Sequence, residues 1–220
     1  MIDYRDGRIK VLALNAIEKC SCECYKVVMV KPRIIERRVC YTGYLSVKNL
    51  RIKLASGVVV DRDVETHGDA AAVLPYDIQR QCALVVRLFR APVFSVTQEE
   101  MIEEACAGMI EQEEDEAAAR REAYEELGVS LHDLERVGRV WSSPGVSTER
   151  QSLFLAAYVV ADRVSIGGGV AGENEGITVV ERPLQQLARE LDQGRIVDGK
   201  LVTLMLALRL RRPELFTRRV

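Results

Sequence analysis

The stretch "REAYEELG", residues 121–128, ends the segment of this chain that has the strongest helical character. The residues before it, "EEDEAAAR", are rich in alanine and place acids in a first helical turn, and Gly128 is a typical C-terminal stop. The sequence therefore predicts a helix that Gly128 ends. On this helix Glu122 and Glu126 stand at i and i+4, so their carboxylates share a face and repel each other.

The placement of these acids lowers the stability of the helix. Glu125 and Glu126 lie just before the stop, at the negative end of the helix dipole, where each charge typically costs about 0.3 to 1 kcal/mol. Arg121 can reach Glu125 at i+4, which leaves Glu122 and Glu126 as an unneutralised pair. Such a pair suits a hard cation with oxygen ligands, such as Mg²⁺. The alternative is a solvated charged face, since acid clusters are common on exposed helices.

The rest of the chain alternates between strand and helix patterns. Short alternating runs from Tyr44 to Gly68 predict antiparallel strands and hairpins. Further strand candidates are residues 70–77, 82–93, 99–112 (as strand and loop), 134–141, 151–160 and 176–183. Two helices are expected to close the chain, at 184–194 and 200–212. Strands, one helix, strands and then helices indicate an α/β sandwich of mixed sheets.

Composition excludes several classes of function. The chain has 220 residues, 31 basic against 33 acidic side chains and a net charge of -2, so neither nucleic acid nor an anionic membrane is expected as the principal partner. The longest apolar run, "LVTLMLALRL", is shorter than the roughly 20 residues of a membrane span and predicts a buried helix. The N-terminal "MIDYRDGRIK" has acids where a signal peptide needs a basic start, so we expect a cytoplasmic protein.

Three of the six cysteines, Cys20, Cys22 and Cys24, alternate along the chain as they would on one face of a strand. They lack the two-residue gap of common zinc sites, so ordinary reduced thiols are expected, with a metal-thiol function as the weaker alternative.

The segment "AGMIEQEEDEAAARREAYEELGV" resembles the signature of the Nudix hydrolases: Gly, five residues, Glu, seven residues, then Arg-Glu-apolar-x-Glu-Glu-x-Gly-apolar. Its second half, residues 121–129, fits at every fixed position, with the small Ala123 as the apolar residue. The first half is one residue short, because twelve positions rather than thirteen separate Gly108 from Arg121. Either Glu113 or Glu114 therefore fills the early glutamate position.

Other stretches resemble the branch of GDP-mannose pyrophosphatases, relatives of the ADP-ribose pyrophosphatases. They occur in the order of that branch and extend the resemblance over about residues 44–210: "RLFR", "EEACAG", "SPGVSTER", "GGGV" and "GRIVDGK". The resemblance implies a Nudix α/β/α sandwich of mixed sheets with an N-terminal antiparallel sheet segment. It divides the chain into a leader of unknown role (1–40), an N-terminal β segment for dimerisation (41–68) and the hydrolase domain (69–220), and it implies a homodimer.

The resemblance also implies roles for particular residues. Mg²⁺, or Mn²⁺ in its place, would be held by the Ala107 carbonyl, Glu122, Glu126 and, from a distant loop, Glu175, with Glu173 as the alternative loop acid. The catalytic residues would be Glu122, Glu126 and Glu175, together with Arg121 and Glu125.

Substrate contacts are implied at five further positions. Arg90 and Arg62 would bind the diphosphate or the base, Glu149 the sugar or nucleoside side, and Lys200 the nucleotide; Tyr44 matches a position proposed to touch the ligand. Each has a structural alternative: surface ion pairs for the arginines, a helix start for Lys200 and packing for Tyr44.

The function implied by the resemblance is Mg²⁺-dependent hydrolysis of the diphosphate bond of a nucleoside diphosphate sugar. GDP-mannose, giving GMP and mannose 1-phosphate, is expected ahead of ADP-ribose, giving AMP and ribose 5-phosphate. A bound divalent ion would screen the phosphate charge and activate a water, and Glu175 is the candidate base or loop ligand. The alternative from another class is a catalytically silent nucleotide-sugar-binding module, although such a module has no need of a carboxylate cluster that destabilises its helix.

Overall fold

A computed structural model of the chain describes residues 31–169 and 176–217, together with the backbone of four short strands before them. These strands form two antiparallel pairs, β1 (Ile2–Arg5) with β2 (Arg8–Val11) and β3 (Ile17–Lys19) with β4 (Tyr25–Val27). Cys20, Cys22 and Cys24 lie outside the described residues. The chain forms two compact units, Met1–His67 and Gly68–Val220.

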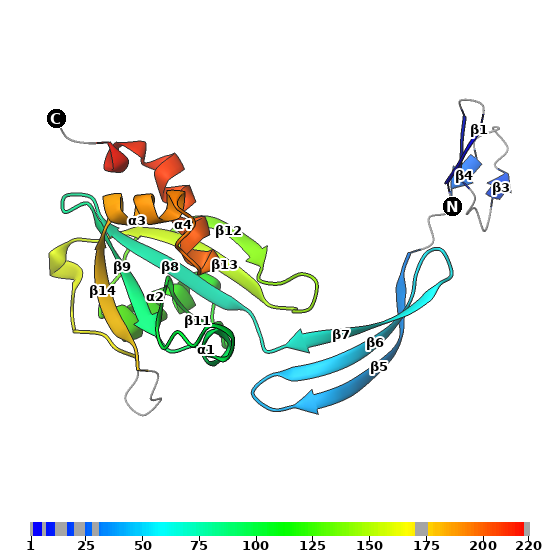
Figure 1. Ribbon diagram of the computed structural model, residues 1–220, viewed down its shortest axis with the longest axis horizontal. Coiled ribbons are helices and arrows are strands. Elements are labelled where there is room, and N and C mark those ends of the chain that lie inside the picture. Colours follow the sequence, from blue (N-terminus) through cyan, green and yellow to red (C-terminus); the bar gives the residue numbers. More distant parts are fainter. Residues whose placement is uncertain are drawn as a thin grey trace. The chain divides into compact units, whose positions relative to one another are not determined.

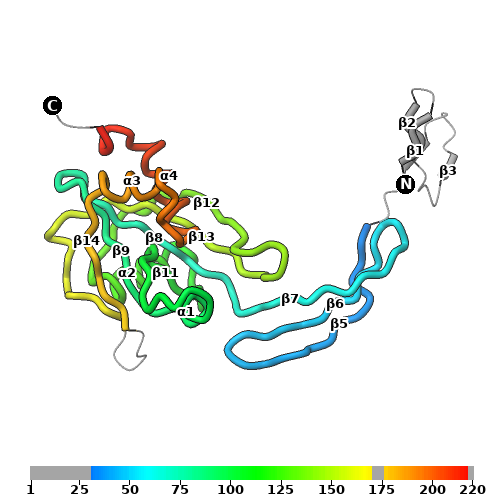
Figure 2. Tube along the Cα trace, in the orientation of Figure 1, coloured from blue at the N-terminus to red at the C-terminus, as the bar shows by residue number. Residues whose placement is uncertain are grey.

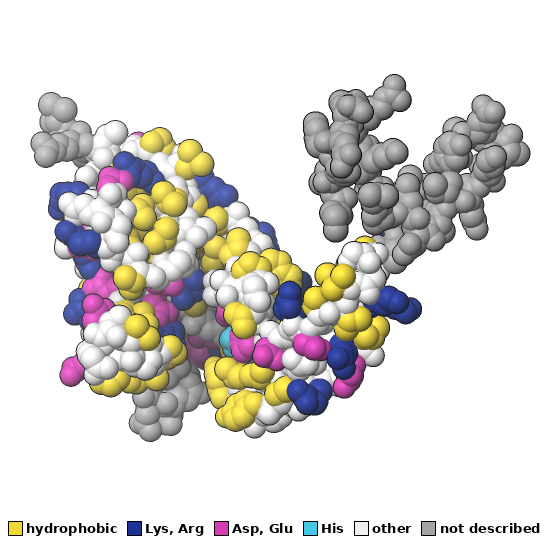
Figure 3. All heavy atoms as spheres, turned by 45° about the vertical axis from the view of Figure 1, so that its right-hand side comes forward, with side chains coloured by type: hydrophobic (Ala, Val, Ile, Leu, Met, Phe, Trp, Pro, Cys, Tyr) yellow, Lys and Arg dark blue, Asp and Glu magenta, His cyan; other side chains and the backbone are white. Residues whose placement is uncertain are grey.

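The first unit contains a three-stranded antiparallel sheet in the order β5 (Arg33–Thr42), β6 (Ser46–Lys53), β7 (Val59–Thr66). This confirms the antiparallel strands expected after Tyr44, and β5 adds a strand before them. All ten residues of β5 are exposed, and hydrophobic side chains lie among charged ones on this sheet (Figure 3).

The second unit is built on a seven-stranded sheet. Its mixture of parallel and antiparallel pairs confirms the mixed sheet that the sequence predicted. Its main path runs β10–β9–β8–β13–β12, with β11 also paired to β8 and β14 to β9. β13 runs parallel to β8, whereas the other pairs are antiparallel. Figure 2 traces the path of the chain through this unit. The strands are β8 (Ala70–Asp77), β9 (Cys82–Leu88), β10 (Ile102–Glu104), β11 (Cys106–Met109), β12 (Glu135–Trp141), β13 (Arg150–Ala157) and β14 (Thr178–Pro183).

Helices cover both faces of this sheet and give the three layers of an α/β/α sandwich (Figure 1). Alternation along β8 divides the core, because Ala71 and Val73 pack toward α2 (Asp115–Leu127) while Ala72 and Leu74 pack toward the opposite helices. That second layer is made by α3 (Leu184–Asp192), α4 (Gly199–Arg211) and the short 3₁₀ helix η2 (Pro213–Phe216). Another 3₁₀ helix, η1 (Val160–Asp162), follows β13.

The chain after β9 differs from the expected strand over residues 82–93. The strand ends at Leu88, and a helix, α1 (Ala91–Thr97), begins where the sequence has Pro92. Proline has its φ angle preset for a first helical turn and lacks the N–H that a strand would need, so it ends the strand and favours the helix.

The apolar run near the C-terminus is the buried helix that the sequence predicted. It lies in α4, whose Leu201, Leu204, Met205 and Leu208 are almost fully buried against the sheet. Among the helices of the described residues, none is long and apolar enough to cross a membrane.

The start of α2 is fixed to the sheet by one carboxylate. Asp115 accepts two hydrogen bonds from Arg136 of β12, at 2.6 and 2.7 Å, and one from Ser152 of β13 at 2.7 Å. The bonds from Arg136, with the help of Ser152, lower the pKa of Asp115 from 3.8 to about 2. Because the folded-state pKa is depressed, this contribution to stability is present above pH 4 and is lost as the pH falls toward 2.

We expect Asp115→Asn to lower the free energy of unfolding at pH 6 by about 1–2 kcal/mol, since it removes the charged acceptor of a partly exposed pair. The difference from wild type should shrink when urea unfolding is repeated at pH 3. Glu116→Gln is the matched control, because Glu116 meets Arg120 at 3.7 Å on the exposed side of the same turn. An equal loss for both variants, or a pH-independent loss for Asp115→Asn, would contradict this assignment.

Candidate active site

The carboxylates of Glu122 and Glu126 converge on one short stretch of β11. Both residues are buried, with 8% and 6% of their surface exposed. Glu126 Oε2 accepts a hydrogen bond from the Ala107 backbone N–H at 3.2 Å. The carboxylate of Glu122 lies so close to Gly108 that a Cβ at that position would collide with it. Residue 108 is therefore glycine because the Glu122 carboxylate occupies the space of a side chain.

Small residues let α2 approach the sheet this closely. Ala118, Ala119 and Ala123 are fully buried on the helix face that packs against β8, β9 and β11. Gly128 ends the helix with a φ of 64°, as predicted, and a Cβ there would meet Ser165. The alanine face and the glycine stop thus fix the depth at which the two glutamates meet β11.

Arg121 neutralises more of the cluster than the sequence indicated. It bonds Glu125 at 3.1 Å, as expected, but the same Nη1 atom also donates to Glu122 at 2.7 Å. Its Nη2 atom donates to the Met109 carbonyl at 3.0 Å. The expectation that Glu122 has no neutralising partner was therefore wrong. The side chains of Arg121 and Glu122, although adjacent in sequence, meet because both turn toward β11.

The structure distinguishes the two candidates for the early glutamate of the signature. Glu113 Oε1 accepts from Arg121 Nε at 3.0 Å and from Arg121 Nη2 at 2.8 Å. Glu114 instead occupies the N-cap position of α2, without a side-chain capping bond. Partial burial disfavours the charged guanidinium, but its bonds to Glu113 and to the helix glutamates outweigh burial and raise the pKa of Arg121 above its ordinary value.

A buried thiol lies beneath the glutamates. Cys106 is fully buried, and its thiol lies near the carboxylate of Glu126. Burial raises the pKa of Cys106 well above its ordinary value, and the neighbouring charge of Glu126 raises it further. The thiol therefore stays protonated beside the carboxylate.

A second cluster of charges lies where β10 leads into β11. Glu104, 4% exposed, accepts from Arg90 Nε at 2.7 Å and from Arg90 Nη2 at 3.1 Å, and also from Lys200 Nζ at 3.0 Å. Burial alone would raise the pKa of Glu104, but the two cations outweigh it and hold that pKa below its usual range. Glu104 thus holds together two of the residues predicted to bind substrate.

Asp198 ties helix α4 to the same strand junction. Its carboxylate caps the helix by accepting from the backbone N–H groups of Lys200 and Leu201, at 3.2 and 3.1 Å. It also accepts from the Ala105 N–H at 3.0 Å and from Lys200 Nζ at 2.8 Å. Lys200 therefore lies at a helix start, which was the structural alternative for it. Its largely buried ammonium also shares the partner Glu104 with Arg90.

Other predicted residues are distributed over both units. Glu149 lies in the β12–β13 connection, where its N–H donates to Ser147 Oγ at 3.1 Å. Tyr44 and Arg62 belong to the first unit: Tyr44 is exposed with its ring 6.2 Å from that of His67, and Arg62 donates to the Asp61 carbonyl at 2.8 Å. Glu173 and Glu175 lie outside the described residues.

The donor set at β11 fits a hard divalent cation. Two carboxylates one helical turn apart, Glu122 and Glu126, are oxygen ligands of the kind that Mg²⁺ prefers. Within residues 31–169 and 176–217, no group of three or more His, Cys, Asp or Glu side chains is arranged to hold a metal ion.

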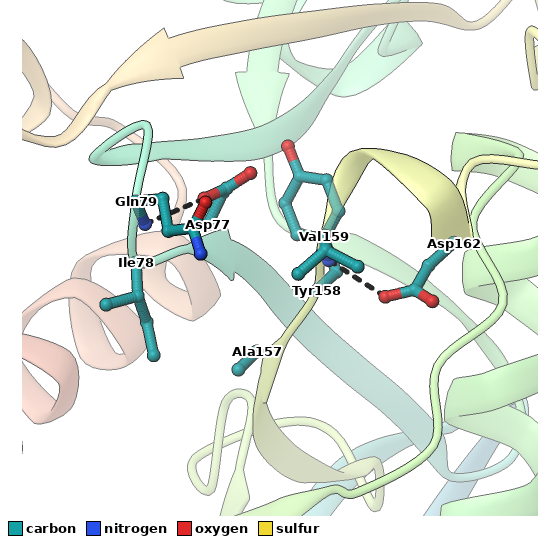
Figure 4. Close-up of a pocket in the computed structure, with 7 residues that line it drawn as sticks. All are labelled: Asp77, Ile78, Gln79, Ala157, Tyr158, Val159 and Asp162. Carbon is teal, nitrogen blue, oxygen red and sulfur yellow. Dashed lines mark hydrogen bonds between the residues drawn. The ribbon is translucent and has the colours of Figure 1, made fainter.

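A separate hollow of about 260 Å³ lies at the far end of β8 from the residues that pair with β11 (Figure 4). Its two carboxylates already bond backbone N–H groups, Asp77 to Gln79 at 2.9 Å and Asp162 to Val159 at 2.8 Å. These bonds hold turns in place, so the hollow is not our candidate site. It is lined by Asp77, Ile78, Gln79, Ala157, Tyr158, Val159 and Asp162.

Three residues of the site were not identified from the sequence. Glu104 and Cys106 lie within "EEACAG" and Asp198 within "GRIVDGK", both of which stood out only as family-like stretches. An Asp before Gly-Lys at a helix start is a recognisable N-cap signal. The pairing of Glu104 with Arg90 and with Lys200, which lie 14 and 96 positions away, has no local signal in the sequence.

We expect Lys200→Met to lower the free energy of unfolding by about 2–4 kcal/mol, because it leaves the largely buried Asp198 without its cation and removes one of the two cations of buried Glu104. Arg209→Met is the matched control on the same helix, since its ion pair with Asp192 is exposed and worth at most about 1 kcal/mol. Chemical denaturation of both variants measures the difference. Equal effects would show that Lys200 does not stabilise the strand junction.

Comparisons with known proteins agree with this geometry. The model of the NUDIX domain family matches residues 66–204. A GDP-mannose pyrophosphatase of Cronobacter sakazakii is 36% identical over 183 residues, which cover 81% of this chain and 95% of that protein. One of Salmonella typhi is 33% identical over 177 residues, 78% of this chain and 92% of that protein. The solved structure of an ADP compounds hydrolase has the same fold, with a TM-score of 0.66 at 18% identity over 84% of this chain and 96% of that chain. The family match covers the carboxylate helix, β11 and the Lys200 junction, and the chain belongs to the Nudix hydrolase family.

Proposed function

We propose that this hydrolase cleaves the diphosphate bond of a nucleoside diphosphate sugar in an Mg²⁺-dependent reaction, and that GDP-mannose is its substrate, giving GMP and mannose 1-phosphate. The observation that carries the proposal is the convergence of two buried carboxylates, Glu122 and Glu126, on the backbone of β11. The substrate assignment is supported by relatives at 33–36% identity that bear the name GDP-mannose pyrophosphatase.

Glu122, Glu126 and the Ala107 carbonyl would hold the metal ion, with Glu175 as a further donor or base by family resemblance. When bound, Mg²⁺, or Mn²⁺ in its place, supplies neutralisation of the diphosphate charge and lowers the pKa of a bound water. Arg121 keeps Glu122 oriented through its 2.7 Å bond and is itself fixed by Glu113 and Glu125. The carboxylates are thereby positioned before the substrate arrives, so less reorganisation is needed during the reaction.

Arg90 and Lys200 would bind the diphosphate. The bonds of Arg90 to Glu104 use Nε and Nη2, so Nη1 is the donor that a phosphate oxygen would take. Lys200 Nζ has three protons, of which Glu104 and Asp198 take two. Glu104 thus acts as a positioning residue that holds both cations and offsets their charge when no substrate is bound.

The sugar and nucleoside ends would be held by residues farther from β11. We assign Glu149 to the sugar or nucleoside side, and Tyr44 and Arg62 to ligand contacts made from the N-terminal β segment, residues 41–68. We assign the hydrolase domain to residues 69–220.

The proposal extends to a homodimer formed through the N-terminal sheet. Every residue of β5 is exposed, and its apolar side chains include Ile34, Ile35 and Val39. A three-stranded sheet with exposed apolar residues is stabilised when another surface covers it.

Light scattering at micromolar concentration should give the mass of two chains, and Val39→Glu should shift that mass toward one chain. A wild-type mass of one chain with full activity would contradict the dimer.

The reaction is tested by measuring product formation from GDP-mannose and ADP-ribose, with Mg²⁺ and with a chelator. We expect GDP-mannose to be the better substrate, turnover to stop on chelation and Mg²⁺ to restore it. Glu126→Gln should lower kcat by about 100-fold or more, because a metal site supplies several kcal/mol of charge stabilisation. Glu116 is a partly exposed glutamate on the same helix, and Glu116→Gln should leave kcat unchanged.

Each contrary outcome rejects a defined part of the proposal. Preference for ADP-ribose would replace the substrate and keep the reaction. Turnover that survives chelation would reject the metal. Tight binding of GDP-mannose without turnover would identify a binding module instead of an enzyme.

A further inference from the structure

Trp141 is a half-exposed aromatic residue at the end of β12, with 53% of its surface accessible. It stands directly opposite Arg150, the first residue of β13, and the Arg150 guanidinium lies 5.8 Å from the centre of the indole ring. A cation at this distance from an aromatic ring attracts it, so Arg150 helps to hold the ring in place.

Arg150 is in turn fixed by a carboxylate. Asp69 accepts from the Arg150 backbone N–H at 2.9 Å and from its Nη2 at 2.7 Å, and it also accepts from Arg139 Nη2 at 2.5 Å. The Asp69 carbonyl accepts from the Ile110 N–H at 2.9 Å, in the connection between β11 and α2. Asp69 therefore connects Arg150, which contacts the Trp141 ring, to the loop that precedes helix α2.

Trp141 lies on the same face of the sheet as the candidate active site. Ser152, two residues after Arg150, bonds Asp115 of α2, so alternation along β13 places Arg150 on the α2 face. Residues directly opposite each other in an antiparallel pair share a face, which places Trp141 there as well.

Trp141 also lies at the same end of the sheet as that site. Ala70 of β8 pairs with Met109 on one side and with Gln151 on the other, so β11, β8, β13 and β12 are successive neighbours at this level. Three strand spacings, about 14 Å, separate Met109 from the position of Trp141. An elongated ligand whose phosphates lie at β11 would extend one end along this row.

We propose that Trp141 is a stacking platform for the nucleobase of the substrate, with Arg150 and Asp69 as positioning residues. This inference rests on the proposed function, because it takes the nucleoside diphosphate from there. A purine has a flat π-face that stacks on indole, and one side of the Trp141 ring is supported by Arg150.

Trp141 is the single tryptophan of the chain, so intrinsic fluorescence reports on this residue alone. We expect GDP, added with Mg²⁺, to change the fluorescence saturably, whereas inorganic pyrophosphate, which has no base, should bind without that change. In assays with GDP-mannose, Trp141→Ala should raise KM by about tenfold with little change in kcat, and Trp141→Phe should keep most of the affinity. Pyrophosphate should inhibit wild type and Trp141→Ala equally.

Three outcomes would overturn the platform. If turnover proceeds but GDP leaves the fluorescence unchanged and Trp141→Ala leaves KM within about twofold, the platform is rejected and the proposed function stands. If light scattering shows that Trp141→Ala changes the oligomeric mass, Trp141 is a subunit contact. If no nucleoside diphosphate sugar is hydrolysed or bound, the proposed function fails and the platform fails with it.

Discussion

The contact between the Glu122 carboxylate and Gly108 is the constraint on which the rest of the site depends. A carboxylate occupies the space of a missing side chain on β11, and this requires α2 to lie at one depth against the sheet. Fully buried alanines permit that depth, and the left-handed Gly128 ends the helix directly after the two glutamates. The acids at the end of α2 are unfavourable for an isolated helix, but in the fold Arg121 and the Ala107 N–H stabilise them.

Two charge networks extend this constraint to the neighbouring elements. Arg121 joins α2 to the Met109 carbonyl and to Glu113 in the connection before the helix. Asp198 and Lys200 join the start of α4 to Glu104 and Ala105, immediately before β11. Helices from both layers of the sandwich therefore hold β11 and the residues immediately before it. In our proposal the first network supports the carboxylates, and the second holds the cations that face the diphosphate.

The sequence predicted the elements with strong local signals. The carboxylate helix, its glycine stop, the strands of the mixed sheet and the buried C-terminal helix follow from periodicity and turn residues, and the family signature implied the α/β/α sandwich. Local patterns could not show that Pro92 starts a helix after a strand, or that Arg121 would reach Glu122. The bonds of Glu104 to Arg90 and Lys200 depend on how distant segments pack, and no spacing in the sequence encodes such contacts.

The most direct test of the account is the affinity of the protein for Mg²⁺, measured by titration calorimetry for wild type, Gly108→Ala and Gly138→Ala. A Cβ at residue 108 displaces the Glu122 carboxylate, whereas one at residue 138 in β12 meets no atom within 4 Å among the described residues. We expect Gly108→Ala to weaken Mg²⁺ binding by about tenfold or more while it remains folded, and Gly138→Ala to bind as wild type does. Equal affinity of all three proteins would contradict the claim that the Glu122–Gly108 contact positions a metal ligand.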